Sequence, residues 1–230
     1  MTIQPEAIAR EPLLPDPSVL RLFGFRPLGF GADYDARLRQ TLLPALLELP
    51  GLREAYVGRR GPDDSGERMI VSIWQSAAAM AAAQSAGGGE LLEIETADEV
   101  GTCRLEIVSL ALDLPFDRAD GAQVLRIFRG QVREGELDLY VEEARNGTLA
   151  DAAGPHGPVG LYLGPQPPDR FVTVSVWTGW ESIEAATHGN IRQPIATSNA
   201  ARLVGGTAAH YEVVPGAAHR MDGLFGPAVR

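Results

Sequence analysis

Two similar stretches of sequence lie about one hundred residues apart and constrain the fold more than any other feature. Residues 19–23 read VLRLF, and residues 124–128 read VLRIF. The same order links Tyr56 to Tyr162, Trp74 to Trp177 and Leu105 to Tyr211, and the four offsets are 105, 106, 103 and 106 residues. Collinear matches with so little drift indicate one unit written twice.

Each copy shows the order strand, helix, strand, strand, helix, strand in its hydrophobic periodicity. Pro44 predicts a kink or break in the first helix. The expected strands are 18–26, 52–60, 68–74 and 102–111 in the first copy and 123–132, 158–164, 170–177 and 207–214 in the second. The expected helices are 33–48 and 76–86 in the first copy and 135–151 and 179–188 in the second.

This order predicts an α+β fold made of two tandem ferredoxin-like βαββαβ repeats. Each repeat has helices on one face of its antiparallel sheet, so we expect the two uncovered faces to pack together as an intramolecular barrel. The expected segments are an N-terminal tail 1–17, repeat one 18–112, a linker 113–121, repeat two 122–215 and a C-terminal tail 216–230. We expect the C-terminal tail to lie over the surface or to reach a neighbouring molecule.

Alternation along the strands separates an apolar set of side chains from a mixed set. The apolar set contains Leu20, Leu22, Val71, Ile73, Leu105, Ile107, Leu125, Ile127, Val174, Val176, Tyr211 and Val213, which we expect under the helices. The mixed set contains Arg21, Phe23, Tyr56, Ser72, Trp74, Arg104, Glu106, Arg126, Phe128, Tyr162, Ser175, Trp177, His210 and Glu212. We expect the mixed set to line the space between the sheets.

Buried charges need partners, so the sequence predicts two cross-strand ion pairs, Arg21 with Glu106 and Arg126 with Glu212. One interpretation is that these pairs and the aromatic side chains only fill the space between the sheets. The other is that they surround a semi-polar cavity for a small aromatic or carboxylated ligand. The residues themselves leave both readings open.

The composition excludes several functions. A net charge of -10 disfavours nucleic acid and anionic membranes as partners. The sequence contains neither a signal-peptide pattern nor a long apolar run, so we expect a cytoplasmic protein. One cysteine and four histidines without helical pair spacing predict no metal site. We expect no cofactor.

The pattern resembles the dimeric α/β-barrel superfamily, and within it the antibiotic biosynthesis monooxygenase domains. The matching features are the turn Pro50-Gly51-Leu52, the strand that ends at Trp177, and the helix that carries Glu181 and residues 186–188. The resemblance covers roughly residues 18–112 and 122–215. It implies a cofactor-independent oxygenase that binds a phenolic compound, helps to form its anion and lets the anion meet oxygen.

The resemblance also implies which residues would act. Trp177, Arg126, Tyr162 and Asn190 are the analogous candidates, and His188 is a catalytic candidate or a surface residue at the end of its helix. Relatives that degrade haem use a helix histidine and an asparagine on the first strand. His188 could match the histidine, but residues 126–129 contain no asparagine, which disfavours haem. The second copy is the better candidate for a site because Ser85 and Ala77 of the first copy replace His188 and Trp180.

The remaining candidates for ligand contact are Phe128, Ser175, His210, Glu212, Arg21, Tyr56 and Trp74. A non-catalytic ligand-binding or stress-related protein is an alternative function. A packed tandem barrel that serves assembly is another, with a homodimer formed through sheet edges or the tail. Fold alone does not distinguish these functions.

Overall fold

The computed structural model describes residues 16–27, 35–36, 38–61, 66–88, 100–115, 121–152, 157–195 and 197–220. The strands are β1 (Val19–Pro27), β2 (Leu52–Gly61), β3 (Arg68–Trp74), β4 (Val100–Ser109), β5 (Leu112–Pro115), β6 (Val124–Val132), β7 (Gly160–Gln166), β8 (Arg170–Trp177) and β9 (Leu203–Arg220). The helices are η1 (Leu38–Leu42), α2 (Leu43–Leu47), α3 (Ala77–Ala83), η2 (Gln84–Gly88), α5 (Leu137–Ala152), α6 (Trp180–Ala186) and η4 (Ala200–Arg202). Most of these elements match the predicted ranges to within a few residues.

Local sequence explains the helix boundaries. Pro44 lies in the first turn of α2, directly after the π-helical turn η1, so the expected break in the first helix is present. The Ser76 side chain caps α3 by accepting a hydrogen bond from the amide of Ala79 at 3.1 Å. Gly51 has φ +82°, and a Cβ atom there would lie 2.6 Å from the Ala79 side chain, so only glycine fits this turn.

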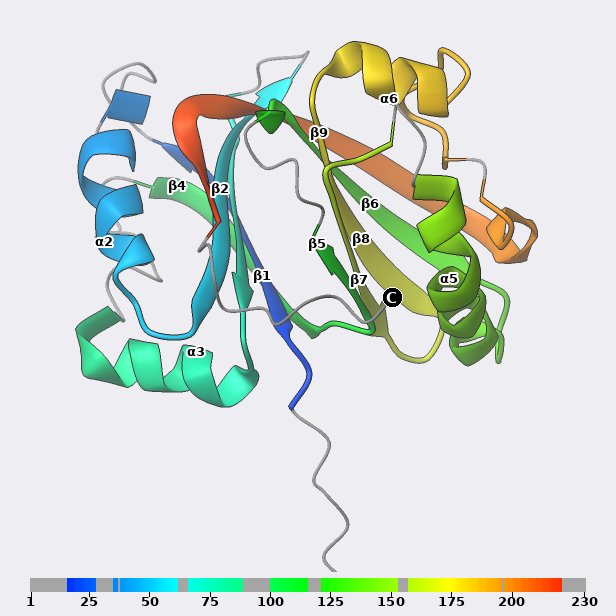
Figure 1. The fold of residues 1–230 in the computed structure, drawn as a ribbon, viewed down its shortest axis with the longest axis horizontal. Coiled ribbons are helices and arrows are strands. Elements are labelled where there is room, and N and C mark those ends of the chain that lie inside the picture. The colour runs from blue at the N-terminus through cyan, green and yellow to red at the C-terminus, as the bar shows by residue number, and fades with distance from the viewer. Residues whose placement is uncertain are drawn as a thin grey trace, which may run out of the picture.

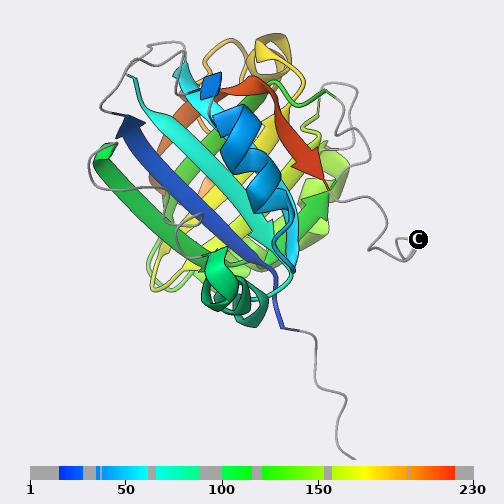
Figure 2. The ribbon, with the colours of Figure 1, turned by 90° about the vertical axis from the view of Figure 1, so that its left-hand side faces the viewer.

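The strands form one antiparallel sheet in the order β4-β1-β3-β2-β9-β6-β8-β7-β5. We call β1 to β4 with their helices the first half, and β6 to β9 with theirs the second half. Helices α2 and α3 lie on one side of the strands, and α5 and α6 lie on the other (Figure 1). Figure 2 shows α2 and α3 in front of the strands of the first half.

Two segments belong to both halves. The amide of Leu110 donates to Ser18 in the first half, and the amide of the next residue, Ala111, donates to Leu163 in the second. Strand β9 pairs with β6 through Glu212 and with β2 from His210 to Arg220. The backbone ladder therefore joins the halves at two places.

Both shared strands extend past the predicted boundaries. Residues 113–115 pair with β7 in β5 and are not linker, and residues 218–220 pair with β2 in β9 and are not tail. Alternation alone did not reveal them because Pro115, Pro215 and Gly216 are poor strand formers that interrupt the pattern. Residues 1–15, 116–120 and 221–230 of the predicted tails and linker lie outside the described residues.

The sequence prediction reversed the two faces of β1, β3, β6, β8 and β9. On β4 the faces are as predicted, since Glu106 shares the face of Leu22 while Leu105 and Ile107 share the face of Phe23 and Arg21. The space between the halves holds a dry cluster of Leu20, Leu22, Val71, Ile73, Leu125, Ile127, Val174, Val176 and Tyr211, with Tyr56 and Tyr162. Phe23 and Trp74 instead pack toward α2 and α3, and Phe128 packs with residues of α5. Only Tyr56 and Tyr162 of the mixed set join the dry cluster.

Hydrogen-bonding capacity explains this reversal. Backbone groups between the sheets are committed to strand pairing, so polar side chains placed there find few partners. The helix side also contains loops, whose free carbonyl groups can accept hydrogen bonds from Arg126 and similar side chains. The prediction weighed apolar character alone and therefore chose the wrong face.

Both predicted ion pairs are wrong. Glu106 lies across from Leu22 and so points to the face opposite Arg21; its carboxylate accepts from Arg129 at 2.7 Å. Glu212 accepts from Arg59 at 3.2 Å, and Arg126 instead donates to a loop carbonyl. The polar exception inside the dry cluster is Glu54, which accepts the hydroxyl hydrogens of Tyr56 and Tyr162, one from each half.

We expect Ile127→Ala to lower the free energy of unfolding by about 2–5 kcal/mol, because Ile127 is fully buried between the halves. The control is Ile107→Ala, since Ile107 is 45% exposed, and its loss should stay below about 1 kcal/mol. Urea denaturation measures both values. Equal losses would contradict the assignment of the dry face.

Candidate functional site

A group of four side chains occurs once in each half with the same geometry. The Trp177 indole donates to the Ser175 hydroxyl at 2.8 Å, and the Trp74 indole donates to Ser72 at 3.0 Å. The guanidinium carbon of Arg126 lies 5.3 Å from the Phe128 ring centre, and Arg21 lies 5.3 Å from Phe23. We call Arg126, Phe128, Ser175 and Trp177 the second-half quartet, and their counterparts the first-half quartet.

The surroundings of the two quartets differ. Leu38, Leu43 and Leu46 pack against the first-half quartet, together with Met80 and Ala83, and all are buried. The second-half quartet borders a cavity of about 340 Å³. This volume lies within the range of small-molecule sites, which is roughly 300–1,000 Å³.

The cavity lies between α5, α6, the segment 194–199 and strands β6, β7 and β8. Its walls are mostly apolar, and its polar side chains come from few positions. The lining residues are Leu112, Arg126, Phe128, Tyr140, Ala144, Gly157, Pro158, Leu161, Leu163, Thr173, Ser175, Trp177, Ala185, Ala186, Pro194, Ile195, Thr197, Asn199 and Leu203. Among these described residues, Arg126 is the only charged one.

Arg126 is a cation held inside the protein. Its side chain is 3% exposed, and its Nη2 atom donates to the Gln193 carbonyl at 2.6 Å. Its Nε atom is buried and has no hydrogen-bond partner. Burial lowers the pKa of Arg126 to about 10, so the guanidinium stays charged at neutral pH.

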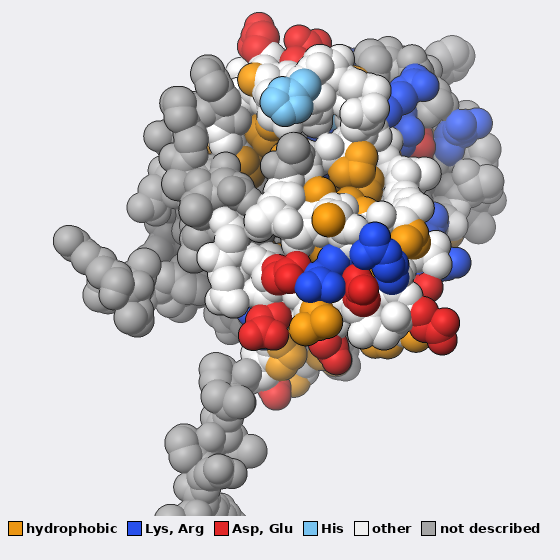
Figure 3. All heavy atoms as spheres, turned by 90° about the vertical axis from the view of Figure 1, so that its right-hand side faces the viewer, with side chains coloured by type: hydrophobic (Ala, Val, Ile, Leu, Met, Phe, Trp, Pro, Cys, Tyr) orange, Lys and Arg blue, Asp and Glu red, His pale blue; other side chains and the backbone are white. Residues whose placement is uncertain are grey.

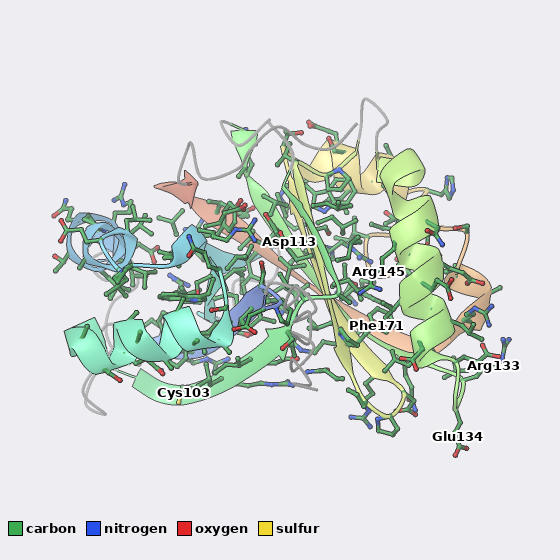
Figure 4. All side chains as sticks on the ribbon, turned by 60° about the horizontal axis from the view of Figure 1, so that its bottom comes forward. Cys103, Asp113, Arg133, Glu134, Arg145 and Phe171 are labelled. Atoms are coloured by element: carbon green, nitrogen blue, oxygen red, sulfur yellow. The ribbon has the colours of Figure 1, made fainter. Side chains whose placement is uncertain are left out.

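The wall opposite the sheet is fixed by polar contacts outside the cavity centre. The Asn199 amide donates to the Tyr140 carbonyl at 3.2 Å, and the Thr197 hydroxyl donates to the Asn199 side chain at 2.7 Å. The Tyr140 ring stacks on Phe171 at 4.4 Å. Figure 4 shows Phe171 between the strands and α5, and Arg145 reaching from α5 toward the sheet, where it donates to the Ala111 carbonyl.

A cluster of ion pairs around Arg202, which we call the clamp, lies on the outer surface at one end of this wall. Arg202 donates to Glu143 at 2.6 Å and to Glu136 at 3.2 Å, and the hydrogen bond from Arg202 lowers the pKa of Glu143. Basic and acidic side chains intermingle on this face of the molecule (Figure 3). The clamp joins α5 to the start of β9, where the next residue, Leu203, lines the cavity.

His210 lies next to Arg126 on the neighbouring strand but does not line the cavity. Its ring is 5.5 Å from Trp180, it hydrogen bonds to the backbone of Ile191, and its Nε2 atom is buried without a partner. Burial, followed by the charges of Arg126, Arg60 and Arg192, lowers the pKa of His210 to about 4. The imidazole is therefore neutral at physiological pH.

The structure brings together four of the residues that the sequence singled out, namely Arg126, Phe128, Ser175 and Trp177. Tyr56 and Tyr162 lie on the other face of the sheet with Glu54, and Arg21 and Trp74 belong to the first-half quartet. His188 and Asn190 are exposed beyond α6, and Glu212 accepts from Arg59 and Trp180. The functional roles predicted for these residues stay predictions.

Sequence reasoning missed the cavity wall formed by Tyr140, Ala144, Pro194, Ile195, Thr197 and Asn199. The helical spacing of Leu137, Val141 and Ala144 does mark the buried face of α5, so Tyr140 and Ala144 could have been found. No periodic pattern marks residues 194–199, because an irregular segment is placed by its tertiary contacts.

The described residues do not fit a metal ion or haem. They contain no group of three or more His, Cys, Asp or Glu side chains that could hold a metal ion. His188, the candidate axial ligand, is exposed and does not line the cavity. Within the part of the chain that the structure describes, no helix is long and apolar enough to cross a membrane.

No protein-family model and no curated protein matches the sequence. Solved structures do match it. A putative monooxygenase of Lactobacillus acidophilus NCFM has a TM-score of 0.68 at 8% identity, and the match covers 90% of this chain and 100% of that one. A putative monooxygenase of Fusobacterium nucleatum has a TM-score of 0.67 at 12% identity, with 91% and 97% covered.

An anthrone oxidase-like protein has a TM-score of 0.58 at 14% identity, and the match covers 93% of this chain and 98% of that one. The chain has the fold of these monooxygenase-like proteins. The likeness confirms the expected α+β class with its large antiparallel sheet. Identities this low carry the fold and not the activity.

We expect Ala186→Leu to leave the free energy of unfolding within about 1 kcal/mol of the wild-type value, because Ala186 faces empty space. Ala83 precedes Ala186 by 103 residues, the same offset as between Trp74 and Trp177, and it is fully buried in a filled core. Ala83→Leu should therefore cost about 1–3 kcal/mol through overpacking. Thermal denaturation of both variants tests this difference between the halves; a larger loss in Ala186→Leu would contradict it.

We expect the stability to fall as the pH drops from 6.5 toward 4, in part because of His210. The unfolded chain binds a proton at this residue near pH 6.5, whereas the folded protein resists protonation down to about pH 4. His210→Gln should flatten this part of the pH profile, by about 3 kcal/mol at most. The exposed His188→Gln is the control, and identical profiles for the two variants would rule out the assignment.

Proposed function

We propose that the chain is a tandem duplication of one ferredoxin-like unit, closed into an intramolecular α/β barrel, and that its second half binds a small aromatic compound. The equal geometry of the two quartets supports the duplication, because unrelated halves would have no reason to repeat it. Strand β9 and the backbone hydrogen bonds of Leu110 and Ala111 support the barrel, since both carry the pairing from one half to the other. The cavity beside Trp177 supports the binding function.

The single observation that carries this proposal is that the helix sides of the two halves, which have the same quartet of side chains, are packed to different extents. Large side chains occupy the helix side of the first half, whereas the helix side of the second half keeps about 340 Å³ open. A core that only stabilised the fold would be packed to similar density in both halves. A maintained apolar cavity with few polar groups is typical of a ligand site.

Oxygenation of an aromatic compound is the enzymatic form of this proposal. A substrate CH₂ group would become a carbonyl group as O₂ gives one oxygen atom to the product and the other leaves as water, with the electrons supplied by the substrate. In such a reaction Arg126 would stabilise negative charge on a substrate oxygen, and Trp177 would hold the ring. The names of structurally similar proteins favour this chemistry, while their low identity leaves it to experiment.

A non-catalytic ligand-binding protein is the second candidate, and one observation favours it. The described lining of the cavity contains no carboxylate and no imidazole, so it offers no ordinary general base for removing a proton from a substrate. A binding protein needs no such group. Assembly through sheet edges is a third proposal, for which the half-exposed Leu105 and Ile107 on β4 provide apolar surface.

We expect oxygen uptake when the purified protein is incubated with phenols and quinols, and we expect Trp177→Ala or Arg126→Ala to reduce the rate at least about tenfold. Arg145→Met is the control, because Arg145 is exposed and does not line the cavity, so its replacement should keep the rate. An oxygen electrode measures the rate. If these compounds bind but no oxygen is consumed, the oxygenase is rejected and the non-catalytic ligand-binding protein is supported.

A further inference from the structure

We infer that residues 188–195, which we call the flap, form a movable cover of the second-half cavity, and that Arg126 and His210 latch this cover to the sheet. The inference rests on the proposed binding function, because a cover matters only where a ligand enters. It adds the route of entry, and it gives the two side chains a role that needs no bound ligand.

The flap separates the cavity from solvent. It follows α6 on the side of the sheet that also carries α5 (Figure 1). Pro194 and Ile195 line the cavity, while every residue of the flap is exposed or half-exposed. Solvent therefore lies on one side of the flap and the cavity on the other, so a displacement of the flap would open the cavity.

The flap keeps its shape through its own hydrogen bonds. The amide of Gly189 donates to the Glu184 carbonyl at 2.8 Å, and the amide of Gln193 donates to the Asn190 carbonyl at 3.0 Å. The amide of Arg192 donates to the Asn190 side chain at 3.2 Å. These bonds stay within the flap and the end of α6, so the flap can move as a unit without losing its turns.

The junction between α6 and the flap has the backbone conformation of a hinge. His188 has φ +51° and Gly189 has φ +84°. Among the residues that the structure describes, His188 is the one other than glycine with a positive φ, a conformation that a side chain with a Cβ atom adopts at a cost. Two successive left-handed residues end the helix here, and a change of their dihedral angles would swing the flap.

Two buried side chains connect the flap to the sheet. Arg126 Nη2 donates to the Gln193 carbonyl at 2.6 Å, and His210 hydrogen bonds to the backbone of Ile191. Arg126 and His210 are opposite each other on β6 and β9, so the latch has one fixed base. Ile191 and Ile195 add apolar contacts, but both are half-buried. Opening the flap would break the two latch bonds and these partial contacts, while the strands stay paired.

Labelling of a thiol inside the cavity measures the opening of the flap without any ligand. The test protein carries Cys103→Ser, which removes the chain's single, exposed cysteine, and Ala144→Cys, because Ala144 lines the cavity and is 3% exposed. We expect its thiol to react with N-ethylmaleimide at least about tenfold more slowly than Cys103 of the wild-type protein. Equal rates would overturn the cover, because the cavity would then be open.

Two variants of this test protein assign the latch. Arg126→Met and His210→Phe should each raise the labelling rate about fivefold or more, since each loses one hydrogen bond to the flap. An unchanged rate in either variant would remove that residue from the latch. Circular dichroism confirms that the variants are folded. If one of them does not fold, the other variant and the rate of the test protein itself decide the question.

Ile127→Ala is the control for global unfolding. Ile127 lies in the apolar cluster between the halves, so its truncation lowers the stability of the whole protein without touching the latch. The labelling rate of this control should stay within about twofold of that of the test protein, because the flap opens locally. A rise as large as in the latch variants would show that labelling follows global unfolding, and would overturn the inference.

The outcomes separate this inference from the proposed function. Slow labelling that the latch variants accelerate, in a protein that binds no aromatic compound, would keep the cover and reject the binding function. Binding of an aromatic compound to a protein whose cavity thiol reacts as fast as Cys103 would reject the cover and keep the binding function.

Discussion

The fold depends on strand β9, which pairs with both halves, and on the segment between β4 and β5, which passes from one half to the other. The chain leaves β1 and joins β7 between consecutive residues, and β9 changes its partner from β6 to β2 along its length. This pairing satisfies backbone groups of one half that would otherwise lie at an unpaired edge. It keeps the two halves together around the apolar cluster that they share.

The dry interior explains where polar chemistry can occur. Aliphatic side chains fill the space between the halves, so Arg126, Ser175 and Trp177 are directed to the helix side. There the segment after α6 supplies the Gln193 carbonyl, and α5 supplies the aromatic wall through Tyr140. The first half has the same quartet of side chains, but large side chains fill the space between that quartet and the helices. In the second half this space stays open, and α5, α6 and the segment between α6 and β9 form its outer wall.

Much of the fold could be predicted from the sequence because strand and helix periods are local signals. The repeated sequence around Trp74 and Trp177, together with the turn at Gly51, predicted the order of the helices and strands and most of their boundaries. The direction of each sheet face could not be predicted, because apolar alternation does not say which side offers partners for Arg21 or Arg126. The ion pairs predicted for Glu106 and Glu212 were wrong because such contacts depend on the register between strands that are far apart in the sequence. The part of the cavity wall formed by Pro194, Ile195, Thr197 and Asn199 could not be predicted either, because these residues follow no helical or strand period.

The central claim is that two equivalent places in the molecule differ in function because one is filled and the other is open. The chain has three tryptophans, and the indole resonances of Trp74 and Trp177 report on these two places in an NMR titration with an aromatic carboxylate. The account predicts that the Trp177 indole resonance shifts on saturation while that of Trp74 stays in place. A shift at Trp74, or binding that moves neither indole, would contradict it.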